Sequence, residues 1–176
     1  MVQWIDTKCD LLPSDIHKGI DYDETFSPVA HFDTIRTILS IAASEKLQLA
    51  QFDVKTAFLY GELEKKVYMQ KPEGYENGLD QVCKLKKSLY GLKQAPRCWN
   101  KKLRELIIRH GLKQSTADPC LLIKTSKDGK LLVVLYVDDG LIAGTDKKLI
   151  SDFLEDWKGN FKITTGPLNC YLGIEI

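Results

Sequence analysis

Apolar residues recur at the three- and four-residue spacing of a buried helix face in three stretches of the chain. The first begins at Asp33, a residue type that caps helix N-termini. The second begins at Pro96, because the fixed φ of proline suits the first turn of a helix. Asp146 caps the third, and Gly159 ends it. The pattern predicts helices over about residues 33–46, 96–110 and 147–158.

Short runs of branched and aromatic apolar residues, bounded by Gly, Pro, Asn or Asp, predict strands between and after these helices. They cover about residues 47–54, 67–70, 82–85, 121–125, 131–137, 141–143 and 171–176, and residues 56–63 indicate a tight helical turn. The order of these elements predicts an α+β fold with an antiparallel sheet and helices packed on one face.

The segment LLVVLYVDDGLIA, residues 131–143, carries the strongest chemical signal. Asp138 and Asp139 interrupt two apolar runs, and the Asp-Gly step at residues 139 and 140 predicts the turn of a hairpin. Two adjacent carboxylates on a buried hairpin repel each other, and a bound cation would offset this repulsion. A divalent metal ion is the leading candidate.

Asp53 ends an apolar strand in the same way as Asp138. If the two strand ends were adjacent, three carboxylates would converge at one edge of the sheet and hold two divalent cations about 3.5–4 Å apart. Oxygen ligands favour Mg²⁺ or Mn²⁺ over zinc or copper. The alternative is that Asp139 and Gly140 only form a turn and that Asp53 only ends a strand, and the acids alone leave both interpretations open.

Response-regulator receivers also bind magnesium with an acid pair that follows an apolar strand. In them the pair follows the first strand of the domain and leads into a helix. Here the pair lies at residues 138 and 139, and LIAG follows as another strand. The arrangement therefore disfavours a receiver.

The 176-residue chain has the composition of one globular domain, with 44% hydrophobic and 28% charged residues. No apolar run approaches the roughly 18 residues of a membrane span, and the N-terminus lacks the basic and apolar regions of a secretory signal. The five cysteines are scattered and the three histidines stand far apart, which favours free thiols over a structural zinc site. The chain has no Walker loop, HExxH or GxSxG motif.

The formal net charge of +1 conceals a basic central block. Residues 81–113 contain ten basic side chains and one acidic one, whereas residues 1–80 carry a net charge of −6. A candidate surface for phosphate backbones is formed by Lys84, Lys86, Lys87, Lys93, Arg97 and Lys101, followed by Lys102, Arg104, Arg109 and Lys113. The alternative is a solvated helix face that happens to be basic, and charge alone leaves both open.

Six motifs carry a resemblance to a known family. They are DYDETFSPVA (21–30), FDVKTAFLYGELEKKVYMQKPEGYE (52–76), VCKLKKSLYGLKQAPRCWN (82–100), DPCLLIK (118–124), LLVVLYVDDGLIAGTD (131–146) and YLGIEI (171–176). In this order and spacing they resemble the reverse transcriptase of copia-type LTR retrotransposons over residues 18–176, after an atypical segment 1–17. The resemblance implies a polymerase palm with partial fingers and no thumb, and an RNA-directed DNA polymerase that transfers a nucleotide from a dNTP to a primer 3′-OH.

In that resemblance, Asp53 matches the motif A metal ligand, and Asp138 and Asp139 match the motif C pair, with two Mg²⁺ or Mn²⁺ ions as cofactors. The backbone carbonyl of Val54 would face the second ion. Phe58 matches the aromatic gate that excludes a ribose 2′-OH, because its ring leaves no room for that oxygen. The alternative for Phe58 is an ordinary core aromatic.

Tyr90, Gly91 and Gln94 match the motif B loop that lies against the incoming nucleotide and the template. Lys162 matches the motif D lysine that donates a proton to the pyrophosphate leaving group, and residues 171–176 match the segment that grips the primer end. The basic block begins in motif B, where template and primer phosphates would lie. The implied partners are an RNA or DNA template–primer, a dNTP and the rest of a Pol polyprotein, and no membrane is implied. The implied location is a cytoplasmic virus-like particle.

The chain departs from the family at both ends. A basic, strand-like segment is expected before residue 18, but Asp6, Asp10 and Asp15 stand there instead of cations that would contact the nucleotide triphosphate. The sequence stops at Ile176, without a thumb, RNase H, protease or integrase. The alternative function is a catalytically inert, transposon-derived remnant that at most binds nucleic acid.

Overall fold

The computed structural model describes residues 2–6, 18–19, 22–71, 81–127, 129–166 and 168–176. The chain divides into two compact units, one formed by Met1–Ser27 and Phe58–Leu103 and the other by Pro28–Ala57 and Arg104–Ile176. Two of the unexpected N-terminal acids, Asp10 and Asp15, lie outside the described residues. Within the described residues, no helix has the length and apolar character that crossing a membrane requires.

A six-stranded antiparallel sheet lies at the centre of the second unit. Its strands are β2 (Gln48–Val54), β5 (Lys113–Gln114), β6 (Leu121–Ser126), β7 (Gly129–Tyr136), β8 (Asp139–Gly144) and β9 (Ile163–Gly166). They lie in the order β5-β6-β7-β8-β2-β9. The strand that contains Asp53 therefore pairs directly with the strand that begins at Asp139.

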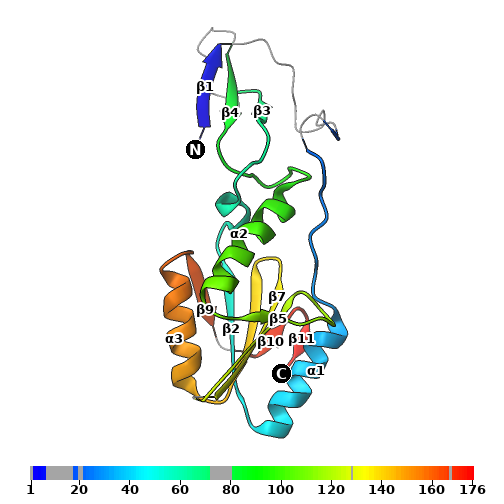
Figure 1. The fold of residues 1–176 in the computed structure, drawn as a ribbon, viewed down its shortest axis with the longest axis vertical. Helices are drawn as coiled ribbons and strands as arrows, with labels where there is room; N and C mark the ends of the chain where they lie inside the picture. Colours follow the sequence, from blue (N-terminus) through cyan, green and yellow to red (C-terminus); the bar gives the residue numbers. More distant parts are fainter. Residues whose placement is uncertain (1, 7–17, 20–21, 72–80, 128, 167) are drawn as a thin grey trace. The chain divides into compact units, whose positions relative to one another are not determined.

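Helices α1 (Phe32–Glu45) and α3 (Lys147–Lys158) cover opposite faces of this sheet (Figure 1). Leu132 belongs to the core cluster under α1, whereas its neighbour Leu131 and Ile150 of α3 both lie against Gly144. Adjacent strand residues point to opposite faces, and Leu131–Leu135 are all buried. The expectation that helices pack on one face is therefore wrong, because a continuous apolar run in β7 needs cover on both faces.

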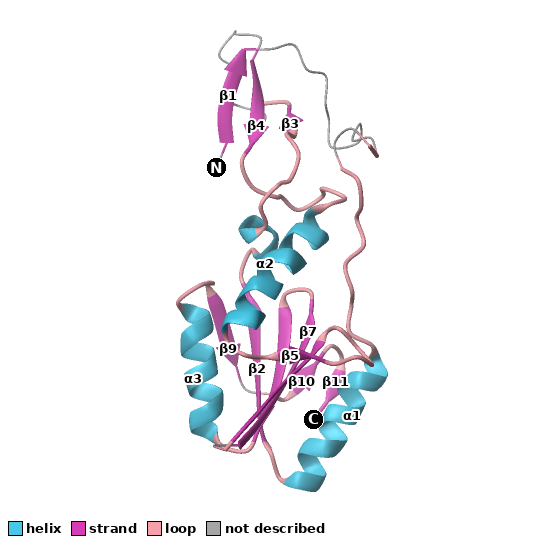
Figure 2. Ribbon diagram, viewed as in Figure 1, coloured by secondary structure: helices cyan, strands magenta, loops and turns pink. Residues whose placement is uncertain are grey.

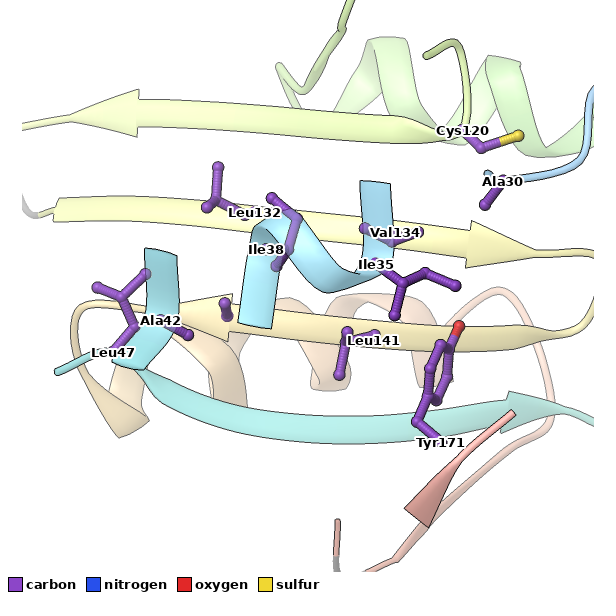
Figure 3. Close-up of a cluster of buried hydrophobic side chains, with 11 residues drawn as sticks. Ala30, Ile35, Ile38, Ala42, Leu47, Cys120, Leu132, Val134, Leu141 and Tyr171 are labelled. Carbon is purple, nitrogen blue, oxygen red and sulfur yellow. The ribbon is translucent and has the colours of Figure 1, made fainter. Parts of the chain in front are cut away.

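The face under α1 holds a hydrophobic core (Figure 3). Ile35 and Ile38 of α1 lie over Val134 of β7 and Leu141 of β8, and Tyr171 reaches the same cluster. Burying one such aliphatic side chain contributes about 1.5–3 kcal/mol. This packing stabilises β7 and β8, the two strands of the hairpin that carries the acid pair.

The start of α1 is held by Asp118 instead of a capping side chain of its own. The N-cap residue is His31, not the expected Asp33, and its side chain makes no capping hydrogen bond. Oδ2 of Asp118 accepts hydrogen bonds from the His31 backbone N–H at 3.1 Å and from the Thr34 hydroxyl at 2.6 Å. Oδ1 accepts from the backbone N–H of Cys120 at 2.8 Å, so one carboxylate joins α1 to the chain before β6.

The expected cap of α3 is confirmed. The Asp146 side chain accepts hydrogen bonds from the backbone N–H groups of Lys148 and Leu149, which have no partner inside the helix. Basic Lys158 lies in the last turn, where it is favourable to the helix dipole.

A three-stranded antiparallel sheet belongs to the first unit (Figure 2). It contains β1 (Val2–Asp6), β3 (Tyr68–Met69) and β4 (Gln81–Leu85) in the order β1-β4-β3. Helix α2 (Ala95–Arg109) begins in this unit, and the 3-10 helix η2 (Ala57–Tyr60) precedes β3. The sequence pattern did not predict β1, which lies inside the atypical segment 1–17.

The C-terminal residues form a small hairpin instead of the single strand expected over 171–176. β10 (Cys170–Tyr171) pairs with β11 (Ile174–Glu175). Leu172 and Gly173 make the reversal with φ of 48° and 82°. The turn points buried Tyr171 into the core under α1.

Candidate active site

Asp53 and Asp139 lie opposite each other on neighbouring strands. In the ladder between β2 and β8, Asp53 pairs with Asp139. Directly opposed residues of an antiparallel pair project to the same face, with Cβ atoms about 4.5–5.5 Å apart. The two carboxylates therefore share one face of the sheet.

Asp138 lies in the two-residue turn between β7 and β8. Tyr136 pairs with Asp139, so the turn consists of Val137 and Asp138. Val137 has a φ of 59°, which a branched residue rarely adopts. The predicted turn at Asp139 and Gly140 is wrong, and with it the interpretation that those two residues only make a turn.

Gly140 serves the packing of the sheet. A Cβ at this position would lie 2.2 Å from ring atoms of Phe52 on the paired strand. The Phe52 ring has little freedom to move, because its centroid lies 5.1 Å from that of Trp157 and 6.3 Å from that of Phe153. The absence of a side chain at residue 140 lets β2 and β8 pair directly beside the acids.

Two hydrogen bonds fix the backbone of the acid pair. The Val54 N–H donates to the carbonyl oxygen of Asp138 at 2.8 Å, which ties the turn to the end of β2. The Tyr171 hydroxyl donates to the carbonyl oxygen of Asp139 at 3.2 Å. Because Tyr171 is only 3% exposed, this second bond connects the acid strand to the core.

Lys55 brings a cation to the acids. Its Nζ lies 2.7 Å from Oδ2 of Asp53. That oxygen is enclosed, and within the described part of the chain it has no partner besides this ion pair. The Lys55 backbone N–H donates to the carbonyl oxygen of Lys162 at 2.9 Å, so the expected motif D lysine lies next to the end of β2 with an exposed side chain.

The pKa of Asp139 and the pKa of Lys55 are both raised at this end of the sheet. Burial raises the pKa of Asp139, the charges of Asp138 and Asp53 raise it further, and Lys55 opposes the rise. The hydrogen bond and charge of Asp53 raise the pKa of Lys55, and Asp138 and Asp139 add smaller contributions. The charges of three carboxylates thus act on one ammonium, which leaves net negative charge at the site.

The donor chemistry fits a hard divalent cation. Carboxylate oxygens suit Mg²⁺ or Mn²⁺, and Oδ2 of Asp53 is an enclosed oxygen that the Lys55 ammonium neutralises. Among the residues that the structure describes, no three His, Cys, Asp or Glu side chains are grouped to hold a metal ion. A cavity of about 210 Å³ lies beside Asp53, Lys55 and Asp139, between the ends of β2, β8 and β9.

The expected gate and motif B residues lie in the first unit. Phe58, in η2, is half-buried, and its ring centroid lies 4.5 Å from that of Tyr90, which is 55% exposed. Phe58 also packs against the small core around Val67 and Leu85. Both interpretations of Phe58, a gate and a core aromatic, are compatible with this position.

The other two motif B residues have unusual environments. Gly91 has a φ of 92°, which glycine adopts without strain. Gln94 is 6% exposed, and its amide oxygen and nitrogen are enclosed without a hydrogen-bond partner in the described part of the chain. A buried amide in that state is costly, since each unmet hydrogen bond costs about 1–3 kcal/mol.

The basic block is partly neutralised within the first unit. Arg97 lies 3.5 Å from Glu24, and Lys101 lies 2.7 Å from Glu64. Lys86 and Lys93 are exposed, whereas Lys84 and Lys87 are half-buried. Two of the six candidate phosphate-binding cations therefore already pair with carboxylates.

The comparison with known proteins decides the family. A family model described as reverse transcriptase (RNA-dependent DNA polymerase) matches residues 15–176. The chain belongs to this reverse transcriptase family. The resemblance that the six motifs predicted is thereby confirmed.

Two relatives of this reverse transcriptase chain are Pol polyproteins of transposons. The retrovirus-related Pol polyprotein from transposon TNT 1-94 of Nicotiana tabacum is 48% identical over 163 residues, which cover 90% of this chain and 12% of the relative. That from transposon RE1 of Arabidopsis thaliana is 39% identical over 160 residues, which cover 89% of this chain and 11% of the relative. The chain thus spans about an eighth of the length of these relatives.

Sequence reasoning missed Lys55 in the candidate site. A signal existed, because Lys55 lies two positions after Asp53, one residue beyond the end of β2, and alternate residues of an extended chain project to the same face. The hydroxyl of Tyr171 was missed for a different reason. Its hydrogen bond to the Asp139 carbonyl oxygen joins two segments that are far apart in the sequence, and no local sequence pattern predicts such a bond.

Proposed function

We propose that this chain is the catalytic part of an RNA-directed DNA polymerase that transfers a nucleotide from a dNTP to a primer 3′-OH. The observation that carries the proposal is the pairing of Asp53 with Asp139, with Asp138 in the adjoining turn. Membership of the reverse transcriptase family supports it. The chain would act as a segment of a longer Pol polyprotein, in a cytoplasmic virus-like particle.

Asp53, Asp138 and Asp139 would hold two Mg²⁺ or Mn²⁺ ions, with the Val54 carbonyl toward the second. When bound, such ions lower the pKa of a hydroxyl and neutralise charge on phosphate oxygens. The protein keeps the three carboxylates at one sheet end through the β2–β8 ladder and the bond from Val54 to Asp138. This preorganisation spares the site a reorganisation cost during the reaction.

The remaining candidate residues would bind and orient the substrates. Phe58 would exclude a ribose 2′-OH by its bulk, while Tyr90, Gly91 and Gln94 would contact the incoming nucleotide and the template. The exposed Lys162 ammonium would give a proton to the departing pyrophosphate. The basic block would bind the phosphates of an RNA or DNA template–primer without reading its sequence.

Primer extension tests the proposal directly. The full chain is incubated with a primed RNA template, dNTPs and Mn²⁺ or Mg²⁺, and Asp138→Asn and Asp53→Asn are compared with wild type. We expect extension by wild type and a loss of at least about a hundredfold in both variants, since metal ligands contribute several kcal/mol to transition-state stabilisation.

Asp33→Asn is the matched control, because Asp33 is a fully exposed carboxylate on α1, with a side chain that is 95% exposed. It should extend primers at the wild-type rate. Extension that survives Asp138→Asn would refute the proposed site. Salt-sensitive binding without any extension would instead support the inert, nucleic-acid-binding alternative.

A further inference from the structure

The ammonium of Lys55 occupies the position from which a cation would neutralise Asp53. The distance from Nζ to Oδ2 is 2.7 Å, and Oδ2 is the enclosed oxygen of that carboxylate. Lys55 also lines the cavity beside Asp53 and Asp139. This oxygen cannot keep its ion pair with Lys55 and also coordinate a divalent ion without weakening one of the two interactions, because the two cations repel each other at such short range.

We propose that Lys55 is an exchangeable counter-cation of the acid site, which binds Asp53 until a divalent metal ion displaces it. The proposal rests on the proposed function in that Asp53 is taken as a metal ligand. Lys55 is then a positioning residue. It sets the concentration of metal ion that the site needs for binding, and it holds the Asp53 carboxylate in its orientation when no metal ion is bound.

Local structure makes this exchange feasible. The side chain of Lys55 is 53% exposed, so a displaced ammonium can move into water and be hydrated there. Its backbone stays fixed, since the Lys55 N–H donates to the Lys162 carbonyl oxygen at 2.9 Å. The side chain therefore moves without disturbing the strand that carries Asp53.

Mn²⁺ binding to the full chain, followed by the electron paramagnetic resonance of free Mn²⁺, tests the proposal without using activity. Wild type is compared with Lys55→Met, which keeps the chain length and removes the charge. We expect the apparent Kd for Mn²⁺ to fall about three- to tenfold in Lys55→Met, since a competing and repelling charge has gone. Lys55→Arg keeps a cation and should stay within about twofold of wild type.

Lys158→Met is the matched control. Lys158 also forms an ion pair at 2.7 Å, with Glu155 on the exposed side of α3, so the change in net charge is the same. Its Kd for Mn²⁺ should change by less than about twofold. Mn²⁺ binding by Lys55→Met that is no tighter than binding by Lys158→Met would overturn the inference, as would absence of binding in both Lys55→Met and wild type.

Asp53→Asn in the Lys55→Met background tests whether the Asp53 carboxylate is the group involved. The gain in affinity should disappear there, and a gain that persists without Asp53 would contradict the exchange. Primer extension separates this inference from the proposed function. Wild-type extension with no effect of Lys55→Met on Mn²⁺ binding rejects only the inference, whereas tighter Mn²⁺ binding without extension rejects only the polymerase.

Discussion

At the scale of single residues, the site depends on two residues that their packed or hydrogen-bonded neighbours hold in one arrangement. Gly140 faces the Phe52 ring, and Asp118 holds three hydrogen-bond donors from two separate segments. Neither residue takes part in the proposed chemistry. Both nevertheless decide whether the acid strands are placed correctly, so their replacement is informative about stability rather than about catalysis.

Gly140→Ala should destabilise the protein by about 2 kcal/mol or more, because its Cβ would overlap a ring packed against Trp157. Urea unfolding measures the change. Gly166→Ala is the control, since a Cβ at Gly166 of β9 meets nothing within 4 Å. It should shift the free energy of unfolding by less than about 0.5 kcal/mol. Equal effects of the two variants would contradict the packing argument.

Asp118 should make stability depend on pH. Burial raises the pKa of Asp118, but the hydrogen bonds from Thr34, Cys120 and His31 outweigh it, so the pKa is lowered overall. A lowered folded-state pKa stabilises the protein above the unfolded value of about 4, and this stabilisation is lost as the pH falls through the folded-state pKa.

Asp118→Asn should therefore cost about 2 kcal/mol at pH 7 and less at pH 3, measured by urea unfolding at both values. Asp152→Asn, at an exposed carboxylate on α3, should show little difference at either pH. A loss of unfolding free energy in Asp118→Asn that is equal at both pH values would show that the charge of the carboxylate does not contribute to stability.

At the scale of elements, local patterns predicted what local physics determines. The three helices and the β6–β7–β8 hairpins follow from apolar spacing, and Asp146 caps α3 as expected. The short strands β1, β5 and β9 were missed. The turn was misplaced because an Asp-Gly pair is common in hairpin turns, whereas Gly140 is required by the Phe52 ring on another strand.

The turn between β7 and β8 should hold strain at Val137. A two-residue hairpin turn with positive φ at its first position favours glycine, and a branched side chain there costs about 1–2 kcal/mol. Val137→Gly should raise the free energy of unfolding by about 0.5–1 kcal/mol, read from thermal melts. Val137→Ala keeps a Cβ and should give a smaller gain. Destabilisation by Val137→Gly would mean that the valine side chain contributes more than the strain removes.

At the scale of the whole molecule, the sequence predicted the family and the three acids, and the structure pairs Asp53 with Asp139. The sequence could not predict the ion pair of Lys55 or the reduced basic surface, since both depend on which charges meet in space. Membership of the family and the remaining exposed lysines together support the proposal that the chain binds nucleic acid through phosphates.

Nucleic-acid binding should weaken steeply with salt. The slope of log K against log salt concentration for a primer–template should decrease in magnitude by about 1.4–1.8 when Lys86 and Lys93 are both replaced by Ala, since each phosphate contact contributes about 0.7–0.9. Fluorescence anisotropy at several salt concentrations measures it. The control is the double replacement of Lys147 and Lys148 by Ala on α3, which should leave the slope unchanged. Equal slopes in both variants would exclude the basic block as the binding surface.

The ladder in which Asp53 faces Asp139 has a consequence for how this chain tolerates change over generations. A strand shifted by one residue turns every side chain to the opposite face. In β8 such a shift would move Asp139 away from Asp53 and Leu141 out of the core under α1 at the same moment. Single-residue insertions and deletions within 131–144 should thus abolish fold and chemistry together, whereas substitutions at the same positions can be graded. We therefore expect this hairpin to tolerate substitutions during evolution but not changes in its length.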